Sequence, residues 1–516
     1  MANCSSVSRF MAFAVFVAVI AATRVLSFAA APGAGLIAAV ENGDHAALAA
    51  SLQGKVDVNA RGADGSTALI WAAHRNDLDA VNLLLEANAE VSAANAYGVT
   101  ALMQASAHGN AAMIEELLKA GADPNAASTE GQTPLLSAAR SGSADAVRVL
   151  LNHGAQVDAQ EGWRRQTALM WAAAANHPDT VQLLIEHGAS VNSRSTVWPQ
   201  KQAKKEDGNL VTPPPKGGLT ALLYAARQGS LEAARVLVKA RADLDQTEPD
   251  GISPVLMALL NAHYDLAAML LEAGADPNVT DKYGRAALYA AIDMYTLEPS
   301  VTRPAPRVDD VRTGLDVARI ALRRGADANA RLVEPAPGRG PSDYPDPILR
   351  AGTTPFIRAA KTGDVKGMKL LLDFGADPHR TTQQGVTALM AAAGLGWKYG
   401  DSQVAEADAL AAVELCLELG IGVNAVTEKG QTALHGAAAR GGDRIVETLV
   451  RHGARLDAED KDGRTPLHIA KGIDPEGNPE KRIPGYASTA ALLLKLQAQT
   501  SPLDAAAANR ATDEKE

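Results

Sequence analysis

The eleven histidines and two cysteines are the side chains best suited to catalysis or metal binding, so their spacing comes first. No histidine shares a metal-ligating spacing with a cysteine or a carboxylate. The sequence contains no Gly-x-Ser-x-Gly elbow, no phosphate-binding glycine loop, no His-Glu-x-x-His and no paired Cys-x-x-Cys. We therefore expect no catalytic residues, no metal site and no cofactor.

The remaining positions of these residues are explained better by helix structure than by chemistry. His153, His187 and His452 each precede a glycine that ends a helix, where an imidazole can interact with the helix C-terminal dipole. Cys416 lies four residues before Gly420, at an inward-facing helix position. We therefore expect Cys416 to be a small buried core residue rather than a nucleophile.

An internal repeat carries these residues. A Gly-x-Thr-Ala/Pro-Leu segment recurs, most often at a step of 33 residues, which is typical of stacked repeat architectures. Its threonine, or the residue in its place, falls at Thr67, Thr100, Thr133, Thr167, Thr220, Ser253, Ala286, Thr354, Thr387, Thr432 and Thr465.

One unit shows the plan of all of them. Thr100 can cap a helix through its hydroxyl, and Leu102 and Ala105 face inward from that helix. His108–Asn110 breaks the helix, and a second helix runs to Gly121, where glycine tolerates the left-handed conformation. We therefore expect two short antiparallel helices and a turn in each unit.

One unit departs from this plan at the end of its second helix. Arg241 stands where most other units have glycine, and the first full unit has Asn88. Because a left-handed conformation is costly for a side chain with a Cβ, this position predicts a strained or rearranged turn.

The sequence resembles the ankyrin repeat family over roughly residues 33 to 498, in segments such as Asp64–Leu69, Gly131–Leu135, Gly121–Asn125 and Asp462–His468. The resemblance implies an all-α repeat solenoid, a curved stack of about a dozen helix–turn–helix units with short β-hairpin fingers. Fingers and first helices would line a concave groove that binds a protein. The family histidine after the leucine of the first helix is kept only in two units, at His435 and His468.

The domain organisation follows from the phase of the repeat. We expect a capping repeat at 33–61, repeats at 62–194, 217–331 and 351–460, finger insertions at 195–216 and 332–350, insertions between the helices of a unit near 296–313, 394–405 and 472–486, a C-terminal capping repeat at 461–498 and a polar tail at 499–516.

The N-terminal segment 1–29 has the pattern of a signal peptide. Arg9 is followed by an apolar run over 10–22 and by the small-x-small sequence Ser27-Phe28-Ala29. We expect an exported protein of bacterial type, periplasmic or secreted, with no membrane insertion after cleavage. The alternative is an uncleaved helix over 10–30 that anchors the chain.

The formal net charge of −10 argues against nucleic acid and against an anionic membrane surface as partners. A protein partner of unknown identity would meet groove and fingertip residues, although each of these could instead be a packing contact or a solvated helix end. Trp71, Trp171 and Tyr224 share one position, for which packing between units is favoured. The candidates for partner binding are His74, Arg75, Tyr97, His108, Arg140, Trp163, Arg164, Arg165, Trp198, Arg227, Lys282, Tyr283 and Tyr344.

The sequence therefore predicts an exported, non-catalytic scaffold for protein–protein interaction. One alternative is an accessory or inhibitory subunit of a secreted or periplasmic enzyme. A weaker one is an enzyme whose site is built from the insertions, which lack a triad-like supply of Ser, His and Asp.

Overall fold

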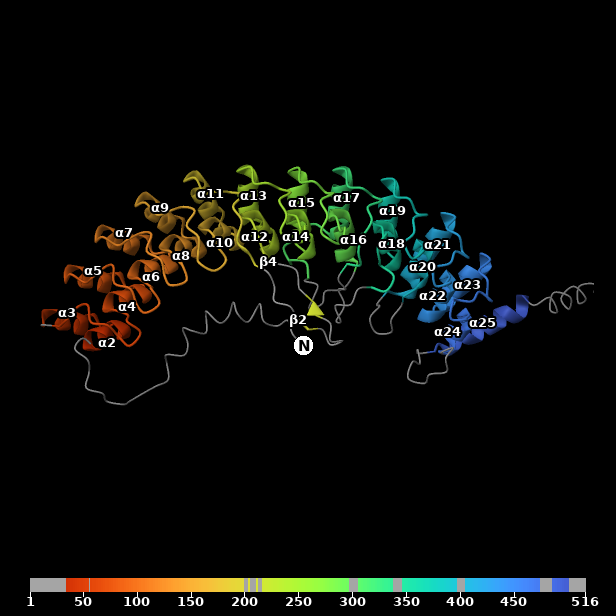
Figure 1. The fold of residues 1–516 in the computed structure, drawn as a ribbon, viewed down its shortest axis with the longest axis horizontal. Coiled ribbons are helices and arrows are strands. Elements are labelled where there is room, and N and C mark those ends of the chain that lie inside the picture. The colour runs from red at the N-terminus through yellow and green to blue at the C-terminus, as the bar shows by residue number, and fades with distance from the viewer. Residues whose placement is uncertain are drawn as a thin grey trace, which may run out of the picture.

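In the residues that the structure describes, twelve pairs of antiparallel helices follow one another in a single curved row (Figure 1). The structure is a computed structural model that describes residues 34–54, 56–198, 203–204, 210–211, 216–296, 305–336, 346–396, 404–473 and 485–500. The expected all-α repeat solenoid of about a dozen units is confirmed in these residues.

The first helix of each pair lies toward the concave side of the row and the second toward the convex side (Figure 1). The first helices are α2 Ala34–Asn42, α4 Ala68–His74, α6 Ala101–His108, α8 Pro134–Ser141, α10 Ala168–Ala174, α12 Ala221–Gln228, α14 Pro254–Leu260, α16 Ala287–Tyr295, α18 Pro355–Lys361, α20 Ala388–Ala393, α22 Ala433–Arg440 and α24 Pro466–Ala470. The second helices are α3 His45–Gln53, α5 Leu78–Glu86, α7 Ala111–Lys119, α9 Ala144–Asn152, α11 Pro178–Glu186, α13 Leu231–Lys239, α15 Tyr264–Glu272, α17 Gly314–Arg323, α19 Val365–Asp373, α21 Glu406–Glu418, α23 Asp443–Arg451 and α25 Ala487–Thr500.

The strands of the described residues all belong to the first finger insertion. Strand β1, Val197–Trp198, pairs antiparallel with β4, Lys216–Gly217, and β2, Ala203–Lys204, pairs with β3, Leu210–Val211. The described parts of the insertion expected at 195–216 therefore pair as antiparallel strands on the concave side (Figure 1).

Threonine caps begin most of the first helices, as the repeat pattern predicts. The Thr100 hydroxyl oxygen accepts a hydrogen bond from the Met103 backbone N–H at 3.3 Å, which satisfies one of the free donors of the first turn. Ser253 makes the same cap with Leu256, whereas Ala286 has no side-chain oxygen and makes none. The repeat thus starts its helices by local chemistry.

The turn at the end of the second helix is the same whether or not it contains glycine. Gly121 has a φ of 96° and Arg241 a φ of 59°, so both are left-handed. The Arg241 N–H donates to Val238 and the next residue to Leu237 at 3.0 Å, the bonds expected of an unbroken turn. Of the two outcomes expected here, the structure has the strained turn and not the rearranged one.

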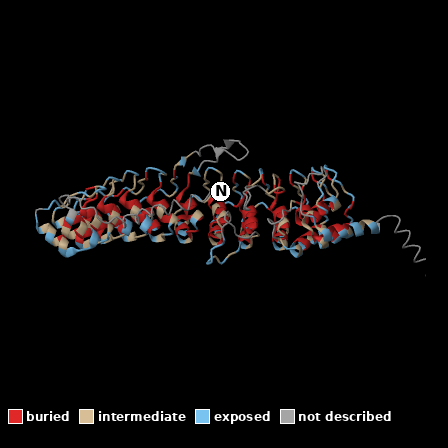
Figure 2. Cartoon of the chain, turned by 90° about the horizontal axis from the view of Figure 1, so that it is seen from below, coloured by how far each residue is buried: buried red, intermediate tan, exposed pale blue. Residues whose placement is uncertain are grey.

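A continuous apolar core runs the length of the row (Figure 2). Leu117 and Leu150 occupy the same position of successive second helices and are fully buried. Cys416 occupies that position in α21, is also fully buried, and has its thiol pKa raised to about 12 by burial. The prediction of a buried core cysteine is confirmed.

Polar side chains between the two helices of a unit tie it to the preceding unit. The Ser143 hydroxyl donates to the Gly109 carbonyl at 2.8 Å, and the Asn110 side-chain amide donates to Asn76 at 2.7 Å. Each bond joins residues 34 positions apart in the chain, so the stacking angle of neighbouring units is set by directional contacts as well as by apolar packing.

Several predicted features lie wholly or partly outside the described residues. They are the N-terminal segment 1–29, Tyr344, parts of each of the five insertions, and residues 501–516 of the tail. The tail expected from 499 begins later, because α25 continues to Thr500. Among the helices that the structure describes, none is both long and apolar enough to cross a membrane.

Candidate protein-binding groove

On the concave side, a residue near the end of a first helix contacts the next unit at three places in the described residues. In each place, the seventh residue after the capping position contacts the fourth residue after that position in the following unit. The pairs are His74 Nδ1 with Gln104 Oε1 at 3.2 Å, the Arg140 guanidinium with the Trp171 ring at 5.7 Å, and Asp293 Oδ1 with Arg358 Nε at 2.6 Å.

Three of the candidate residues contact neighbouring units. His74 forms a hydrogen bond with Gln104 of the next unit. It also makes an edge-on contact with Trp71, whose ring centroid is 5.6 Å away. His108 Nε2 lies 2.6 Å from the His74 carbonyl oxygen, and Arg75 donates to the Glu41 carbonyl at 2.7 Å. These residues therefore link neighbouring units at the N-terminal end of the groove.

An arginine–aromatic cluster lies in the middle of the groove and consists of Trp163, Arg164, Trp198, Tyr224 and Arg227. The Arg164 guanidinium carbon is 5.9 Å from the Trp163 ring centroid and 5.7 Å from that of Trp198, which belongs to the next finger. The Arg227 guanidinium lies 4.9 Å over the Tyr224 ring. Cation–π contacts of this kind hold guanidinium groups in place without neutralising their charge.

The fingertip before α10 holds its backbone rigidly and exposes its tryptophan. Both oxygens of the buried Glu161 carboxylate accept backbone N–H bonds, from Trp163 at 2.7 Å and from Arg164 at 2.6 Å. Arg165 adopts a left-handed φ of 54° and donates to Gln160 at 2.6 Å. Trp163 itself is 76% exposed, so it is not buried against the next finger.

In the part of the chain that the structure describes, the guanidinium groups of Arg164 and Arg227, and that of nearby Arg140, have no anionic partner. Burial lowers the pKa of Arg227, and the nearby positive charge of Arg164 lowers it further. Within the described residues Arg140, Arg164 and Arg227 form no ion pair, whereas Arg148 on the outer helix α9 pairs with Asp145 at 2.6 Å. Because the partial desolvation of a charge without a counter-ion is unfavourable, half-buried Arg227 favours the binding of an anion in this part of the groove.

The remaining fingertip candidates have different surroundings. Lys282 already forms an ion pair with Asp250 at 3.3 Å, and its ammonium lies 5.1 Å from the Tyr283 ring. Arg285 lies on the same ring at 5.3 Å, so Tyr283 is held between two cations. Tyr97 is 54% exposed. Of the fingertip aromatics, Trp163 is the most accessible.

Sequence reasoning missed a cavity of about 230 Å³ toward the C-terminal end of the groove. Pro347 and Ile348, from the end of the second finger insertion, form one wall, and Val386, Leu395 and Arg464 line the rest. The return of an insertion over two later units has no periodic signal. The short spacing of Gly394 and Gly396 was the available hint, because a Cβ on Gly396 would clash with Ile348.

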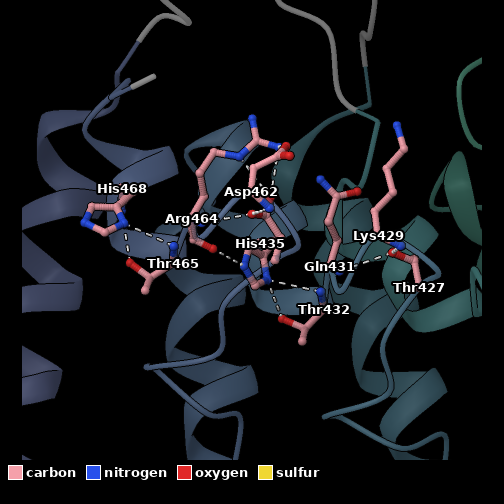
Figure 3. Close-up of polar contacts among 10 residues, drawn as sticks. Thr427, Lys429, Gln431, Thr432, His435, Asp462, Arg464, Thr465 and His468 are labelled. Carbon is pink, nitrogen blue, oxygen red and sulfur yellow. Dashed lines mark hydrogen bonds and ion pairs between the residues drawn. The ribbon is translucent and has the colours of Figure 1, made fainter. Parts of the chain in front are cut away.

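The polar groups beside this cavity are bonded to one another (Figure 3). His435 Nδ1 accepts from the Thr432 N–H at 3.1 Å, and its Nε2–H donates to the Arg464 carbonyl at 3.0 Å. Burial lowers the pKa of His435. The Arg464 guanidinium pairs with Asp460 and Asp462. The polar groups at this cavity are thus bonded to one another, unlike the guanidinium groups of the arginine–aromatic cluster.

No group of three or more His, Cys, Asp and Glu side chains that could hold a metal ion occurs in the part of the chain that the structure describes. The buried Cys416 thiol lies in the core and away from solvent.

Comparison with known proteins identifies the repeat. A family model described as ankyrin repeats in three copies matches residues 36–128, 117–195, 201–281 and 402–474, and the single ankyrin repeat model matches residues 351–383. Together these ranges cover more than half of the chain.

Similar curated proteins share the repeat over part of their length. The chain is 30% identical to ankyrin repeat and SAM domain-containing protein 6 of Danio rerio over 166 residues, covering 31% of this chain and 22% of that protein. It is 28% identical to the B-cell lymphoma 3 protein homolog of Mus musculus over 221 residues, 39% of this chain and 47% of that protein. It is 37% identical to protein phosphatase 1 regulatory subunit 27 of Homo sapiens over 67 residues, 13% of this chain and 44% of that protein. The chain therefore spans about half or less of the length of each of these relatives.

Proposed function

Because this chain belongs to the ankyrin repeat family, we propose that it is an exported, non-catalytic scaffold that binds a protein partner along its concave groove. Ankyrin repeats and the relatives above support a role in protein–protein interaction. The observation that carries the proposal for this chain is the fingertip Trp163, a large apolar side chain that is 76% exposed on a rigid turn.

The side chains of the groove need little additional ordering when a partner binds. Tryptophan and arginine are the side chains most often responsible for binding energy at protein interfaces. Here Glu161 holds the backbone of Trp163 and Arg164, and the aromatic rings hold the guanidinium groups. A preformed surface of this kind loses little conformational entropy when the partner docks.

The test begins with affinity capture of a partner from the exported fraction, identified by mass spectrometry. We then expect Trp163→Ala to weaken the binding of that partner about tenfold or more, because the variant loses a central interface residue. The affinity is measured by calorimetric titration. The control is Phe374→Ala, which removes an aromatic that is 40% exposed at the end of the outer helix α19. Equal affinities for wild type and Trp163→Ala would remove this residue from the interface.

A second candidate role is that of an accessory or inhibitory subunit of a secreted or periplasmic enzyme. It is favoured by the similarity to a protein named as a phosphatase regulatory subunit. Enzyme activity that co-purifies with this chain and that the isolated chain lacks would support the accessory role. Turnover by the isolated chain would instead support an enzymatic site built from the insertions.

The proposal of export rests on residues 1–29, whose sequence pattern is that of a signal peptide. Mass spectrometry of the protein purified from its native cells should find an N-terminus at Ala30 in the periplasmic or secreted fraction. An intact N-terminus in the membrane fraction would favour the uncleaved anchor, and a chain found only in the cytosol would contradict both.

A further inference from the structure

We propose that the middle of the groove recognises an acidic polypeptide segment, whose carboxylates take the unfilled place opposite Arg140, Arg164 and Arg227. This inference rests on the proposed function and specifies the chemistry of the partner. The three arginines come from α8, the finger before α10, and α12, so they lie on consecutive units of the row.

The charge balance of this region favours an anionic ligand. The chain carries a formal net charge of −10, and arginines on its outer helices, such as Arg148, pair with nearby carboxylates. The three groove arginines contact aromatic rings instead. A positive region without counter-ions on an acidic protein is complementary to an anionic ligand.

The environment of Arg227 also favours an anionic ligand. Arg227 is half-buried, its guanidinium lies on Tyr224, and it is close enough to Arg164 for the two charges to repel each other. On the neighbouring helix α10, the indole N–H of Trp171, the ring under Arg140, is buried and has no hydrogen-bond acceptor among the described residues. The region therefore presents hydrogen-bond donors and positive charge, and a carboxylate supplies the acceptors that are missing.

The arrangement of the side chains favours a polypeptide over other polyanions. Guanidinium groups bind carboxylates through two parallel N–H bonds, and the planar groups here are held in place by their aromatic rings. Trp163 exposes an apolar surface next to Arg164, which suits a chain that alternates acidic and apolar side chains. A nucleic acid or an anionic membrane would also meet the acidic remainder of the molecule and be repelled by it.

The experiment uses the full chain and a fluorescein-labelled peptide of alternating Glu and Pro, followed by fluorescence anisotropy. We expect binding that weakens as salt is raised, and no binding of the same peptide with Gln in place of Glu. Arg164→Gln and Arg227→Gln should each weaken binding about tenfold, the loss of one charge-assisted contact. Arg148→Gln on the outer helix is the matched control and should leave the affinity unchanged.

Four results would overturn the inference. They are the absence of Glu-Pro binding at low salt, equal binding by the Arg164→Gln and Arg227→Gln variants, equal binding of a single-stranded oligothymidylate, and binding that appears only in a Glu206→Gln/Asp207→Asn variant. The last would show that the acidic pair of the chain's own finger insertion is the occupant. Arg164→Gln alters a fingertip, and it keeps the test informative even if Arg227→Gln does not fold.

Two experimental outcomes distinguish a failure of this inference from a failure of the proposed function. If a captured partner is weakened by Trp163→Ala but not by Arg164→Gln or Arg227→Gln, the groove binds a protein and the acidic chemistry is wrong. If neither the arginine variants nor Trp163→Ala affects any captured partner, both proposals fail.

Discussion

At the scale of the residue, the same side chain acquires different chemistry according to the unit that follows it. His435 and His468 occupy equivalent positions, and both accept a backbone hydrogen bond from a capping threonine (Figure 3). His435 is buried because the next finger covers it, and its Nε2–H reaches the Arg464 carbonyl. His468 lies in the last unit and is exposed.

The burial of His435 predicts that acid destabilises the array. Burial lowers the pKa of His435 and of His263 below the value of an unfolded chain, so the unfolded state binds more protons just below pH 6.5. The stability conferred by the neutral imidazoles is therefore present above that pH and is lost as pH falls through the folded pKa. We expect urea unfolding to give a lower free energy at pH 5.5 than at pH 7.5.

His435→Gln removes one titrating group and should reduce this pH difference by on the order of 1 kcal/mol for each unit by which the pKa is depressed. His468→Gln is the matched control, since it changes the equivalent exposed residue, and it should leave the difference as in wild type. A pH difference that is equal in wild type and His435→Gln would count against the buried neutral imidazole.

At the scale of the element, helix ends are determined by nearby residues, such as a capping side chain or a left-handed glycine. Two helix ends lack the usual residue. Ala286 begins α16 without a side-chain cap, and Arg241 ends the α13 turn in a left-handed conformation. The backbone hydrogen bonds of that turn are nevertheless those of the glycine turns. The fold of each unit tolerates a strained residue because packing on both sides determines the turn.

The strained turn predicts a stabilising substitution. Arg241→Gly removes a left-handed strain of roughly 1–2 kcal/mol at a cost of roughly 0.5–1 kcal/mol in unfolded-chain entropy, so the net gain should be about 0.5–1 kcal/mol. Arg241 is exposed and makes no ion pair among the described residues, so little else is lost. The rise is measured as a shift in the midpoint of urea unfolding.

The equivalent turn at Gly121 provides the reverse control. Its φ is 96° and a Cβ there would meet no atom within 4 Å, so Gly121→Ala introduces conformational strain without a clash and should destabilise. Two substitutions with effects of the same sign would show that left-handed strain does not decide the stability of these turns.

At the scale of the whole molecule, the array has an unusual interface near its middle, between α16 and α18. Fully buried Arg358 pairs with Asp293 at 2.6 Å, and the Tyr295 hydroxyl bonds the Asp364 carboxylate across the same interface. Since each unit contacts only its neighbours, one interface can determine whether the two halves unfold together.

Arg358→Met removes the buried cation that pairs with Asp293 and should weaken this interface by about 3–5 kcal/mol, enough to separate the unfolding of the two halves. Four of the five tryptophans lie before α16 and report on the N-terminal half, whereas far-ultraviolet circular dichroism reports on all helices. We expect the two signals to coincide in wild type and to diverge in the variant. The four are Trp71, Trp163, Trp171 and Trp198.

The double variant Asp293→Leu/Arg358→Met serves as the control for the charge itself. Replacing both partners leaves no unpaired charge, so the double variant should be more stable than Arg358→Met. Coincident transitions in Arg358→Met, or a double variant that is less stable than the single one, would mean that the ion pair does not couple the halves.

The amino-acid sequence alone determined the unit, its period and its helix ends. Thr100 caps a helix, Gly121 ends one and Cys416 is buried, and the structure confirms each of these. The physical reason is that capping, left-handed turns and the apolar face of a helix depend on residues within a few positions of one another.

Only the tertiary structure decided which side chains meet across units. It brings Arg164 onto Trp198, Asp293 onto Arg358, and Ile348 over the units that form the C-terminal cavity. These residues are 34 or more positions apart or lie in insertions that break the repeat, so no local pattern records their contact. Their meeting depends on the rotation between stacked units and on where each insertion returns. The sequence therefore placed the candidate residues on the groove. The stacking of units bonded some of them to their neighbours and, among the residues that the structure describes, left three arginines outside any ion pair.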